Sequence, residues 1–344
     1  MILPLLVLLA SAITIVSINL LRPLAISINL VDTPSFRKKH SGIIPLIGGI
    51  SMFLGVILTI LVSSYDLNDF SYFLFASLAI ILIGVLDDHQ DISASVRLVF
   101  QVLIGIILVL SGKINIESFG NIISNDELIL NQWSYFVTIL AIITGINAVN
   151  MADGIDGLAG GNSLITFLAI LYLSIDSLNR EILLIVFLFC AVLPVFLIFN
   201  LCLGISSKKK IFMGDAGSMF IGLTIVWVLI DLSQGSTRSF SPVTALWLFS
   251  IPLIDLSAAF LRRLFSGTSP FKPDLFHIHH LLMKSGIREK YALILILFAS
   301  LIMATIGILG EILAIPEKLM FIGFMVIFGI YIVTYRFSLI KIKK

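Results

Sequence analysis

Eleven apolar runs dominate the sequence, and each is about as long as a membrane-spanning helix. A helix that crosses the hydrocarbon core of a bilayer needs roughly 20 mainly apolar residues. The runs fall at residues 2–20, 45–64, 70–86, 97–112, 133–149, 162–176, 181–199, 216–231, 242–260, 291–309 and 319–335. Only 12% of the residues are charged, against about 25% in soluble domains. The sequence therefore predicts an all-α, polytopic membrane protein of about 11 transmembrane helices, with residues 1–344 forming a single transmembrane domain.

Lysine and arginine are distributed unevenly between the alternate loops that join the apolar runs. Of the 22 basic residues, 18 fall on one side, and the other side holds only Lys113, Arg180, Arg238 and Lys318. Because loops rich in lysine and arginine stay in the cytoplasm, the N-terminus is expected outside and the C-terminus in the cytoplasm. The first run lacks a basic leader and a small-residue cleavage site, so it is expected to be retained as a span.

All five histidines and every dense acidic cluster fall on the cytoplasmic side of this topology. The loops that carry them lie near residues 21–44, 87–97, 150–161, 200–215 and 261–290. The external segments hold scattered acids without a pattern. A functional site is therefore expected on the cytoplasmic face.

The stretch NAVNMADGIDGLAGG places Asn147, Asn150, Asp153 and Asp156 at intervals of three. If the segment is helical, this spacing keeps the four side chains on one slowly drifting face. Acids and amides at a membrane boundary are costly to desolvate, so the stretch predicts a polar site with a cation or a phosphate nearby. A tight, glycine-rich helix contact with solvated acids is the alternative.

Two shorter acidic motifs lie at the edges of apolar runs. DDHQD carries Asp87, Asp88 and Asp91 directly after one run, and FMGDAGS carries Asp215 between glycines at the expected start of another. Neighbouring carboxylates can bind Mg²⁺ or hold one acid as a base. An acid at a helix start also meets free backbone N–H groups and the positive end of the helix dipole. Both motifs therefore predict either metal ligands or helix caps. In FMGDAGS, a metal ligand would face a diphosphate.

The segment RRLFSGTSPFKPDLFHIHH combines basic residues with three histidines in four positions. Its basic and imidazole groups are Arg262, Arg263, Lys272, His277, His279 and His280. These groups suit a phosphate ligand. Zinc is a rival, but no cysteine lies nearby and H-x-H-H is not a usual zinc spacing. Binding to anionic lipid headgroups would explain the arginines but not the histidines.

Acids for Mg²⁺ and cations for phosphate, on one rim of a membrane bundle, together predict phosphoryl chemistry on a nucleotide substrate. The second substrate is expected to be a lipid, because a membrane-embedded site has little reason to exist for two soluble reactants. The net charge of +2 gives no indication of nucleic-acid binding, and no nucleic-acid partner is expected.

The ordered set of cytoplasmic motifs resembles the polyprenyl-phosphate N-acetylhexosamine-1-phosphate transferases, the membrane family that starts bacterial glycan assembly on a lipid carrier. The motifs are VDTPSFRKKHSGIIPLIGG, DDHQD, NAVNMADGIDGLAGG, FMGDAGS and SPFKPDLFHIHHL. The peptidoglycan branch of the family carries a run of histidines in the last loop, so the HIHH here favours the GlcNAc branch. The resemblance implies transfer of GlcNAc-1-phosphate from UDP-GlcNAc to undecaprenyl phosphate with release of UMP, which would initiate O-antigen or common-antigen type polysaccharide synthesis.

The resemblance also implies a metal centre. Asp215 and Asn150 resemble the pair that holds Mg²⁺, for which Mn²⁺ could substitute. Asp87 and Asp88 match acids assigned either to the metal or to activation of the lipid phosphate. Asp91 matches an acid whose role is least settled, and His40 falls within the first shared motif without an assigned role.

Further residues match the family's substrate-binding positions. Arg97 lies where relatives place a basic residue, often lysine, on the diphosphate, and Arg keeps the charge but alters its geometry. Asp156 and Phe212 resemble residues that hydrogen-bond and stack on uracil, and Asn147 and Asp153 fall in the same nucleotide-binding stretch. The expected phosphate-binding loop holds Arg263, His277, His279 and His280, and His279 is also expected to be catalytic. The resemblance implies a multi-pass protein of the bacterial inner membrane with its active site facing the cytoplasm.

Several alternatives stay open from the sequence. A single in-line displacement is preferred to a double displacement through an aspartyl-phosphate on Asp87 or Asp88. The donor could be another UDP-N-acetylhexosamine, carrying GalNAc, QuiNAc or MurNAc-pentapeptide. An intramembrane DDxxD prenyltransferase would need a second motif of that kind, and a transporter would place ionisable residues near mid-membrane in paired repeats. A homodimer is left open, because helix contacts look alike within and between chains.

Overall fold

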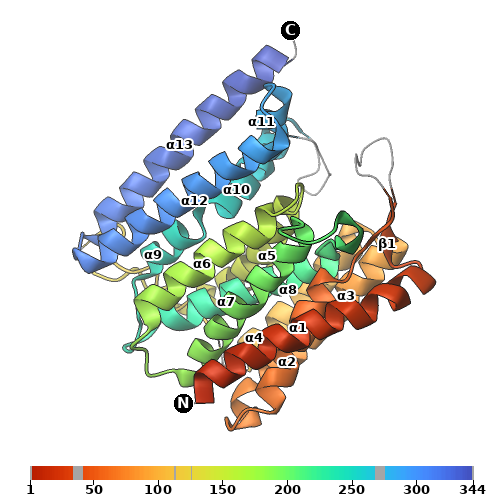
Figure 1. Cartoon of the computed structure of the whole chain (residues 1–344). Helices are drawn as coiled ribbons and strands as arrows, with labels where there is room; N and C mark the ends of the chain where they lie inside the picture. The colour runs from red at the N-terminus through yellow and green to blue at the C-terminus, as the bar shows by residue number, and fades with distance from the viewer. Residues whose placement is uncertain (1, 34–41, 112–113, 125, 268–275, 343–344) are drawn as a thin grey trace.

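A computed structural model shows a bundle of helices and describes residues 2–33, 42–111, 114–124, 126–267 and 276–342 (Figure 1). The helices are α1 (Ile2–Ser27), α2 (Gly48–Leu61), α3 (Leu67–Gln90), α4 (Ala94–Leu110), α5 (Ser134–Ala152), α6 (Leu158–Ser174), α7 (Arg180–Asn200), α8 (Gly214–Ser233), α9 (Pro242–Leu248), α10 (Ser250–Phe265), α11 (Ile278–Lys284), α12 (Glu289–Ile312) and α13 (Glu317–Ile342). Two strands, β1 (Val31–Asp32) and β2 (Ile44–Pro45), pair antiparallel with Val31 opposite Pro45. The helices dominate the architecture, as the apolar runs predicted.

Every predicted apolar run falls on one or more of these helices. Within the described residues, seven helices are long and apolar enough to cross a membrane, or eight if the bent pair α9–α10 is one span. Three shorter apolar helices, α2, α4 and α6, contain 14, 17 and 17 residues. Large apolar side chains stay exposed along α1, α4, α12 and α13, where they face the surroundings as lipid-facing side chains do. The chain is a polytopic, all-helical membrane protein.

Helix α8 forms the centre of the bundle, with almost all of its side chains buried. Helices α2, α3 and α5 pack around it, while α12 and α13 lie on one flank (Figure 1). Helix α3 approaches α8 closely because Gly84 has no side chain, and a Cβ there would collide with the backbone of Ala216. This contact brings the acids at the end of α3 against the first turn of α8.

The ninth apolar run is not the single helix that was expected over 242–260. It divides into α9 and α10, which meet at an angle of 87°. Pro252 lies in the first turn of α10 and has no N–H to donate to the carbonyl of Leu248, which favours the break between α9 and α10. The freed carbonyl instead accepts a hydrogen bond from the Thr166 hydroxyl on α6 at 2.9 Å. A neighbouring side chain thus satisfies the backbone at the break, as an apolar environment requires.

The stretch 147–161 is also not one helix. Helix α5 ends at Ala152, a turn follows, and α6 begins at Leu158 after Gly157, which adopts a left-handed φ of 78°. The proposed single polar face therefore holds only for Asn147 and Asn150. The later acids of the stretch lie in the turn.

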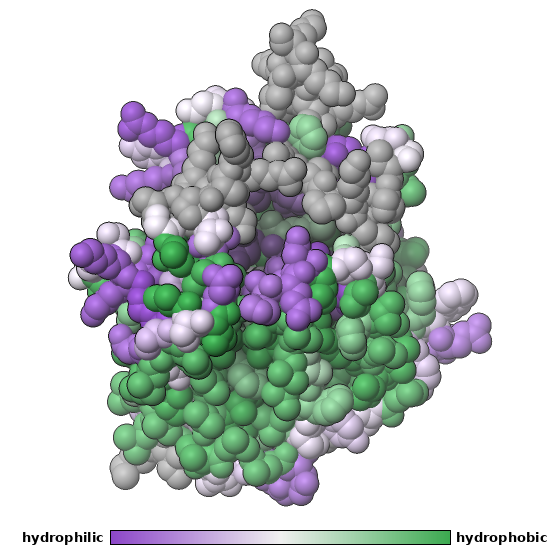
Figure 2. All heavy atoms as spheres, turned by 90° about the vertical axis from the view of Figure 1, so that its right-hand side faces the viewer, coloured by the Kyte–Doolittle hydropathy of each residue, from purple (hydrophilic) through white to green (hydrophobic). Residues whose placement is uncertain are grey.

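A β-hairpin helps to place the segment before α8. The N–H of Phe212 donates to the carbonyl of Pro45 at 3.0 Å, and the N–H of Gly48 donates to the carbonyl of Phe212 at 2.9 Å. Figure 2 shows hydrophobic side chains in a broad band, with hydrophilic side chains gathered on one side of it around a recess. The polar segments that were expected to form a site lie on one end of the bundle.

Candidate active site

Carboxylates from two helices meet at the start of α8. Asp87, at the end of α3, has a side chain only 1% exposed and accepts a hydrogen bond from Arg97 Nη1 at 2.5 Å. The same Arg97 nitrogen lies 3.7 Å from Asp215 Oδ2 in the first turn of α8. A buried carboxylate is stable only when it is paired, so Arg97, from the start of α4, supplies the charge that Asp87 needs. We call Asp87, Asp88, Asp215, Asn150 and Arg97 the acidic cluster.

Asp88 contacts the backbone of α8. Its Oδ1 accepts from the N–H of Asp215 at 2.8 Å, and its Oδ2 accepts from the N–H of Ala216 at 3.2 Å. The first N–H groups of a helix have no partner within the helix, and a carboxylate there is favoured by the helix dipole. Asp88 therefore caps α8 from a different helix. The cap holds Asp215 in position, so the cap interpretation applies to Asp88, and the metal-ligand interpretation of Asp215 stays a prediction.

Asn150 joins the acidic cluster from α5. Its Nδ2 donates to Asp215 Oδ1 and, at 3.0 Å, to the hydroxyl of Ser218. The structure thus brings Asn150 and Asp215 side by side, although 64 residues separate them in the chain. The predicted metal pair is in contact, and its oxygens are of the kind that Mg²⁺ prefers.

The acidic cluster contains more negative than positive charge. Asp153, at the end of α5, lies near enough to Asp215 and Asp156 for their carboxylates to repel. Asp215 also repels Asp87 and Asp88. Among the described residues, Arg97 is the cation that contacts Asp87 and Asp215. Like charges at this distance are costly outside bulk water, and a divalent cation would offset the excess.

The described residues contain no group of three His, Cys, Asp or Glu side chains that could hold a metal ion together. Mg²⁺ does not require such a cage, because it commonly binds through one or two carboxylates, retained waters and substrate phosphates. Asp215 with the carboxamide of Asn150 fits that mode. Zinc, which prefers a closed set of nitrogen and sulfur ligands, does not fit the acidic cluster.

A second set of contacts surrounds Asp156 in the turn before α6. Asp156 forms an ion pair with Lys210, and Lys210 Nζ lies 5.2 Å from the centroid of the Phe212 ring. Arg22, at the end of α1, holds this segment through the carbonyls of Lys208 and Lys210. The predicted uracil pair, Asp156 and Phe212, is thus joined through a lysine. An aromatic ring beside a carboxylate can stack on a base and accept a hydrogen bond from it.

Three histidines lie at the start of α11, and one of them contacts the same turn. We call His277, His279 and His280 the histidine loop. The rings of His277 and His279 lie 6.0 Å apart and nearly parallel, and those of His279 and His280 lie 4.1 Å apart. His279 packs directly on Gly154, where a Cβ would collide with its ring. Gly154 therefore lets the histidine loop dock beside the acids.

His279 is buried, with 1% of its surface exposed, and neither ring nitrogen has a hydrogen-bond partner among the described residues. Burial and the neighbouring His280 lower the pKa of His279 to about 3, so its ring is neutral at physiological pH. A buried polar group without a partner costs about 1–3 kcal/mol. Such a group at a polar recess is typical of a binding site, where a ligand supplies the partner.

A buried carboxylate on α10, Asp255, supports the histidine loop. Its Oδ2 lies 2.9 Å from Nδ1 of His277, and its Oδ1 accepts from the N–H of Ile278 at 3.0 Å and from the Tyr331 hydroxyl at 2.6 Å. Asp255 was not predicted as a site residue. An ionisable side chain inside an apolar run was the available signal, since Asp255 lies within 242–260.

Other expected site residues lie apart from these contacts. The amide of Asn147 donates to Gln101 Oε1 on α4 at 2.7 Å and to the carbonyl of Ile143 at 2.8 Å. Asp91 is exposed and ends α3 in a left-handed conformation. Arg263 is buried at the end of α10, and His40 lies outside the described residues. The structure thus joins the acidic cluster, Asp156 and the histidine loop around the turn 153–157.

Lys210, Ser218 and Arg22 were also not predicted as site residues. Lys210 was predicted only to lie on the cytoplasmic side, although it is two residues before Phe212. Ser218 lies one helical turn after Asp215, and this spacing places both on one face. Nothing in the sequence connects Arg22 with the carbonyl groups that it binds, because backbone acceptors carry no residue-specific signal.

The assembled site has acids for a metal, a cation beside them, and neutral imidazole nitrogens opposite a turn. This combination can bind a charged diphosphate and stabilise charge that moves between phosphate oxygens. An aromatic ring and a carboxylate at its edge can hold a base. The arrangement therefore fits phosphoryl transfer from a nucleotide-linked donor.

Comparisons with known proteins agree with this geometry. The family model described as Glycosyl transferase family 4 matches residues 70–233, which include the acidic cluster and Asp156. The undecaprenyl-phosphate α-N-acetylglucosaminyl 1-phosphate transferase of Escherichia coli (strain K12) is 42% identical over 313 residues, covering 90% of this chain and 84% of the relative. The enzymes of the same name from Salmonella typhi and Haemophilus influenzae are each 41% identical, covering 92% and 91% of this chain and 87% and 88% of their own lengths.

Proposed function

This chain belongs to glycosyl transferase family 4, the family of the undecaprenyl-phosphate α-N-acetylglucosaminyl 1-phosphate transferases, and we propose that it transfers GlcNAc-1-phosphate from UDP-GlcNAc to undecaprenyl phosphate. UMP is the second product. The lipid-diphosphate-linked sugar would then begin an O-antigen or common-antigen type polysaccharide. Family membership does not favour the prenyltransferase or the transporter.

The observation that carries this proposal is the contact between Asp215 and Asn150 inside an excess of negative charge. A cluster in which carboxylates face one another is unfavourable by itself. It becomes favourable when a divalent cation and the diphosphate that the cation neutralises are present. The neighbouring Asp156, Lys210 and Phe212 supply the groups that a uridine would need.

Mg²⁺ is the proposed cofactor, held by Asp215 with the carboxamide oxygen of Asn150, and Mn²⁺ is the expected substitute. The Nδ2 of Asn150 donates to Asp215, while its Oδ1 has no partner among the described residues. When bound, the metal would neutralise charge on the diphosphate oxygens. Asp88 would not bind the metal itself, because its side chain caps α8 and sets the position of Asp215.

The reaction that we propose is a single in-line displacement. An oxygen of the lipid phosphate forms a bond to the β-phosphorus of UDP-GlcNAc, and the bond from that phosphorus to the bridging oxygen of UMP breaks. Arg97 neutralises charge on the diphosphate, and His279 is close enough to the turn 153–157 to bind a phosphate oxygen. The carboxylate and ring of Asp156 and Phe212 hold the uracil.

The contacts of Asp87 and Asp88 support a single displacement. A nucleophilic carboxylate needs a free oxygen directed at the phosphorus. Both oxygens of Asp88 accept backbone hydrogen bonds, and Asp87 is paired with Arg97. Asp88 therefore presents no free oxygen for attack, and Asp87 is buried with one oxygen held by Arg97. Inversion at a chiral β-phosphorus would agree with one displacement, and retention would require the aspartyl-phosphate route.

We also propose that the chain crosses the bacterial inner membrane eleven times, with the N-terminus outside and the active site facing the cytoplasm. The three shorter helices, α2, α4 and α6, can each cross if the bilayer thins around them or their flanking side chains snorkel to the interface. Cysteines introduced as Ser285→Cys and Ser124→Cys would test this topology. Impermeant maleimide added to intact cells should label the Ser124→Cys variant only, and labelling of the Ser285→Cys variant would reverse the orientation.

The proposed reaction is tested with purified protein, labelled UDP-GlcNAc, undecaprenyl phosphate and MgCl₂. We expect release of UMP together with transfer of label to the lipid, and no transfer after chelation of the metal. UDP-GalNAc in a parallel assay tests the choice of sugar. Absence of both products from the folded protein would overturn the proposal, and faster turnover of UDP-GalNAc would overturn the choice of GlcNAc.

A further inference from the structure

Asp255 is a carboxylate buried in the interior of a helical bundle. Only 6% of the residue is exposed, and it lies on α10, which begins at the break after α9. Desolvation of a carboxylate costs several kcal/mol unless partners replace the lost water. A hydrophobic side chain of similar size would avoid this cost, so a specific reason for the acid is expected in its contacts.

The three partners of Asp255 come from two other parts of the chain. Oδ2 lies 2.9 Å from His277 Nδ1, while Oδ1 accepts from the N–H of Ile278 at 3.0 Å and from the hydroxyl of Tyr331 on α13 at 2.6 Å. His277 is the residue that precedes α11. One carboxylate therefore holds the start of α11, a histidine ring and the C-terminal helix together.

The contact with His277 determines which of its nitrogens is available. A carboxylate beside Nδ1 keeps the proton on that nitrogen and fixes the plane of the ring. Nε2, on the opposite side of the ring, then remains for another partner. The nearly parallel stacking of His277 on His279, at 6.0 Å, passes this orientation to the ring that packs on Gly154.

We propose that Asp255 is a positioning residue for the phosphate-transfer reaction, acting through His277 and steadied by Tyr331. The inference rests on the proposed function, because it takes the histidine loop to bind a phosphate of the substrates. Asp255 does not touch the substrates. It orients the histidine loop, and Tyr331 links that orientation to the packing of α13.

The substitution Asp255→Asn tests this role with little change in size. The amide oxygen can still accept from the backbone N–H and the tyrosine hydroxyl, but the amide NH₂ that replaces Oδ2 cannot accept the Nδ1 proton of His277. We expect kcat/KM to fall ten- to a hundredfold, mainly through kcat, as for other groups that orient a functional histidine. Tyr331→Phe removes one of three contacts and should cost about two- to fivefold.

Glu311→Gln is the matched control. Glu311 Oε2 also accepts three hydrogen bonds, from the N–H and hydroxyl of Ser241 and from the hydroxyl of Thr244, but at the opposite end of the bundle. This variant should lower the unfolding temperature and leave kcat/KM unchanged at lower temperatures. A loss of activity equal to that of Asp255→Asn would mean that both substitutions act through stability.

The decisive measurement is a double-mutant cycle with His277→Ala. If Asp255 acts through His277, Asp255→Asn should cost less than twofold in the His277→Ala background. An equal cost with and without His277, or wild-type activity of Asp255→Asn, would overturn the positioning role. If Asp255→Asn does not fold, Tyr331→Phe replaces it in the same cycle. Failure of the proposed function would look different, because the wild-type protein itself would then release no UMP.

Discussion

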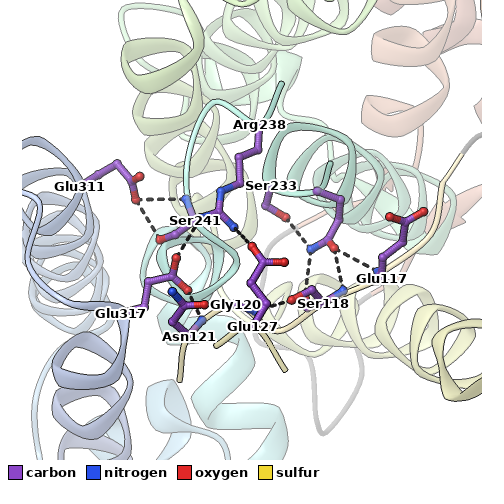
Figure 3. A network of polar contacts seen from close by, with 11 residues as sticks. Glu117, Ser118, Gly120, Asn121, Glu127, Ser233, Arg238, Ser241, Glu311 and Glu317 are labelled. Carbon is purple, nitrogen blue, oxygen red and sulfur yellow. Dashed lines mark hydrogen bonds and ion pairs between the residues drawn. The ribbon is translucent and has the colours of Figure 1, made fainter. Parts of the chain in front are cut away.

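The two ends of the bundle are both polar, but they satisfy their acids in opposite ways. At the end opposite the active site, Glu311 accepts from hydroxyl and N–H donors, and Glu317 accepts from the N–H of Asn121 at 2.7 Å and from Arg238 at 3.1 Å (Figure 3). At the active-site end, Asp215 and its neighbours repel one another. The acids at the first end contact donors, whereas those at the active-site end contact donors and also repel one another, which leaves an excess of negative charge.

The same contrast applies to neutral polar groups. Gln234 bridges the strand-like segment after α4, accepting from the N–H groups of Glu117 and Ser118 at 3.0 and 3.1 Å and donating to the carbonyl of Ser118 at 3.2 Å (Figure 3). His279 is more deeply buried than Gln234, and neither of its ring nitrogens has a partner among the described residues. A satisfied network rigidifies a structure. An unsatisfied group is one that a ligand could satisfy, which is the role proposed for His279.

The largest effect should come from Asp215→Asn. Loss of this carboxylate removes the proposed metal ligand, and turnover should fall at least about a thousandfold, or about 4 kcal/mol in activation free energy. The unfolding temperature should stay the same or rise, because one repelling charge is gone. Steady-state kinetics at several Mg²⁺ concentrations and thermal unfolding in detergent would measure both. Near-normal turnover would contradict the metal role of Asp215. A large drop in unfolding temperature would mean that Asp215 stabilises the fold, as the acids at the opposite end do.

The next effect concerns pH and His279. Its folded-state pKa of about 3 lies below the unfolded value of about 6.5, so the unfolded chain binds the extra proton as the pH falls between these values. The stabilisation from the neutral ring is therefore complete above about pH 6.5 and is lost on acidification. Between pH 7 and 5 the wild-type protein should lose about 2 kcal/mol more than His279→Gln does. The measurement is the unfolding temperature of the wild-type and His279→Gln proteins at both pH values. An equal change in the two proteins would contradict the neutral, buried state of His279.

A smaller effect is expected from Asp156→Ala. The change removes the carboxylate proposed to bind uracil and leaves Lys210 without its ion pair. The KM for UDP-GlcNAc should rise about tenfold, equivalent to about 1.4 kcal/mol, while the KM for the lipid stays constant. Lys210→Met serves as the control for the lost ion pair. Equal changes in both KM values would show that Asp156 does not act on the nucleotide.

The smallest effect belongs to the opposite end. Arg238→Met breaks the ion pairs of Arg238 with Glu127 and Glu317. Partly exposed pairs contribute about 1 kcal/mol or less, so the unfolding temperature should fall by roughly 2 °C with no change in kcat/KM. A loss of turnover at low temperature would indicate that this network communicates with the active site.

The helices could be predicted from the sequence because their signal is local. A run of about 20 apolar side chains excludes most alternatives to a helix in a membrane, and every predicted run contains helix. The break at Phe249 was missed, since Pro252 signals a helix start as readily as a kink. The turn 153–157 was missed because intervals of three are compatible with a helix until the glycines between them are placed.

The site was predicted in part for a different reason. Asp215, Asn150, Asp156 and the histidine loop stood out because polar groups are costly beside a membrane and so need a purpose. Asp255 did not stand out, since a single acid in an apolar run shows no spacing pattern. Its meaning depends on His277 and Tyr331, which are 22 and 76 residues further along the chain.

The sequence by itself determined the class of protein and the kinds of chemical group in its site. Both follow from composition and local order, which persist however the helices are arranged. Only the tertiary structure decided the role of each acid: Asp88 caps α8, Asp87 pairs with Arg97, and Asp215 meets Asn150. These roles depend on the close approach of α3 and α5 to α8. Side chains that are chemically identical differ there only in which partner the packing brings within hydrogen-bond distance.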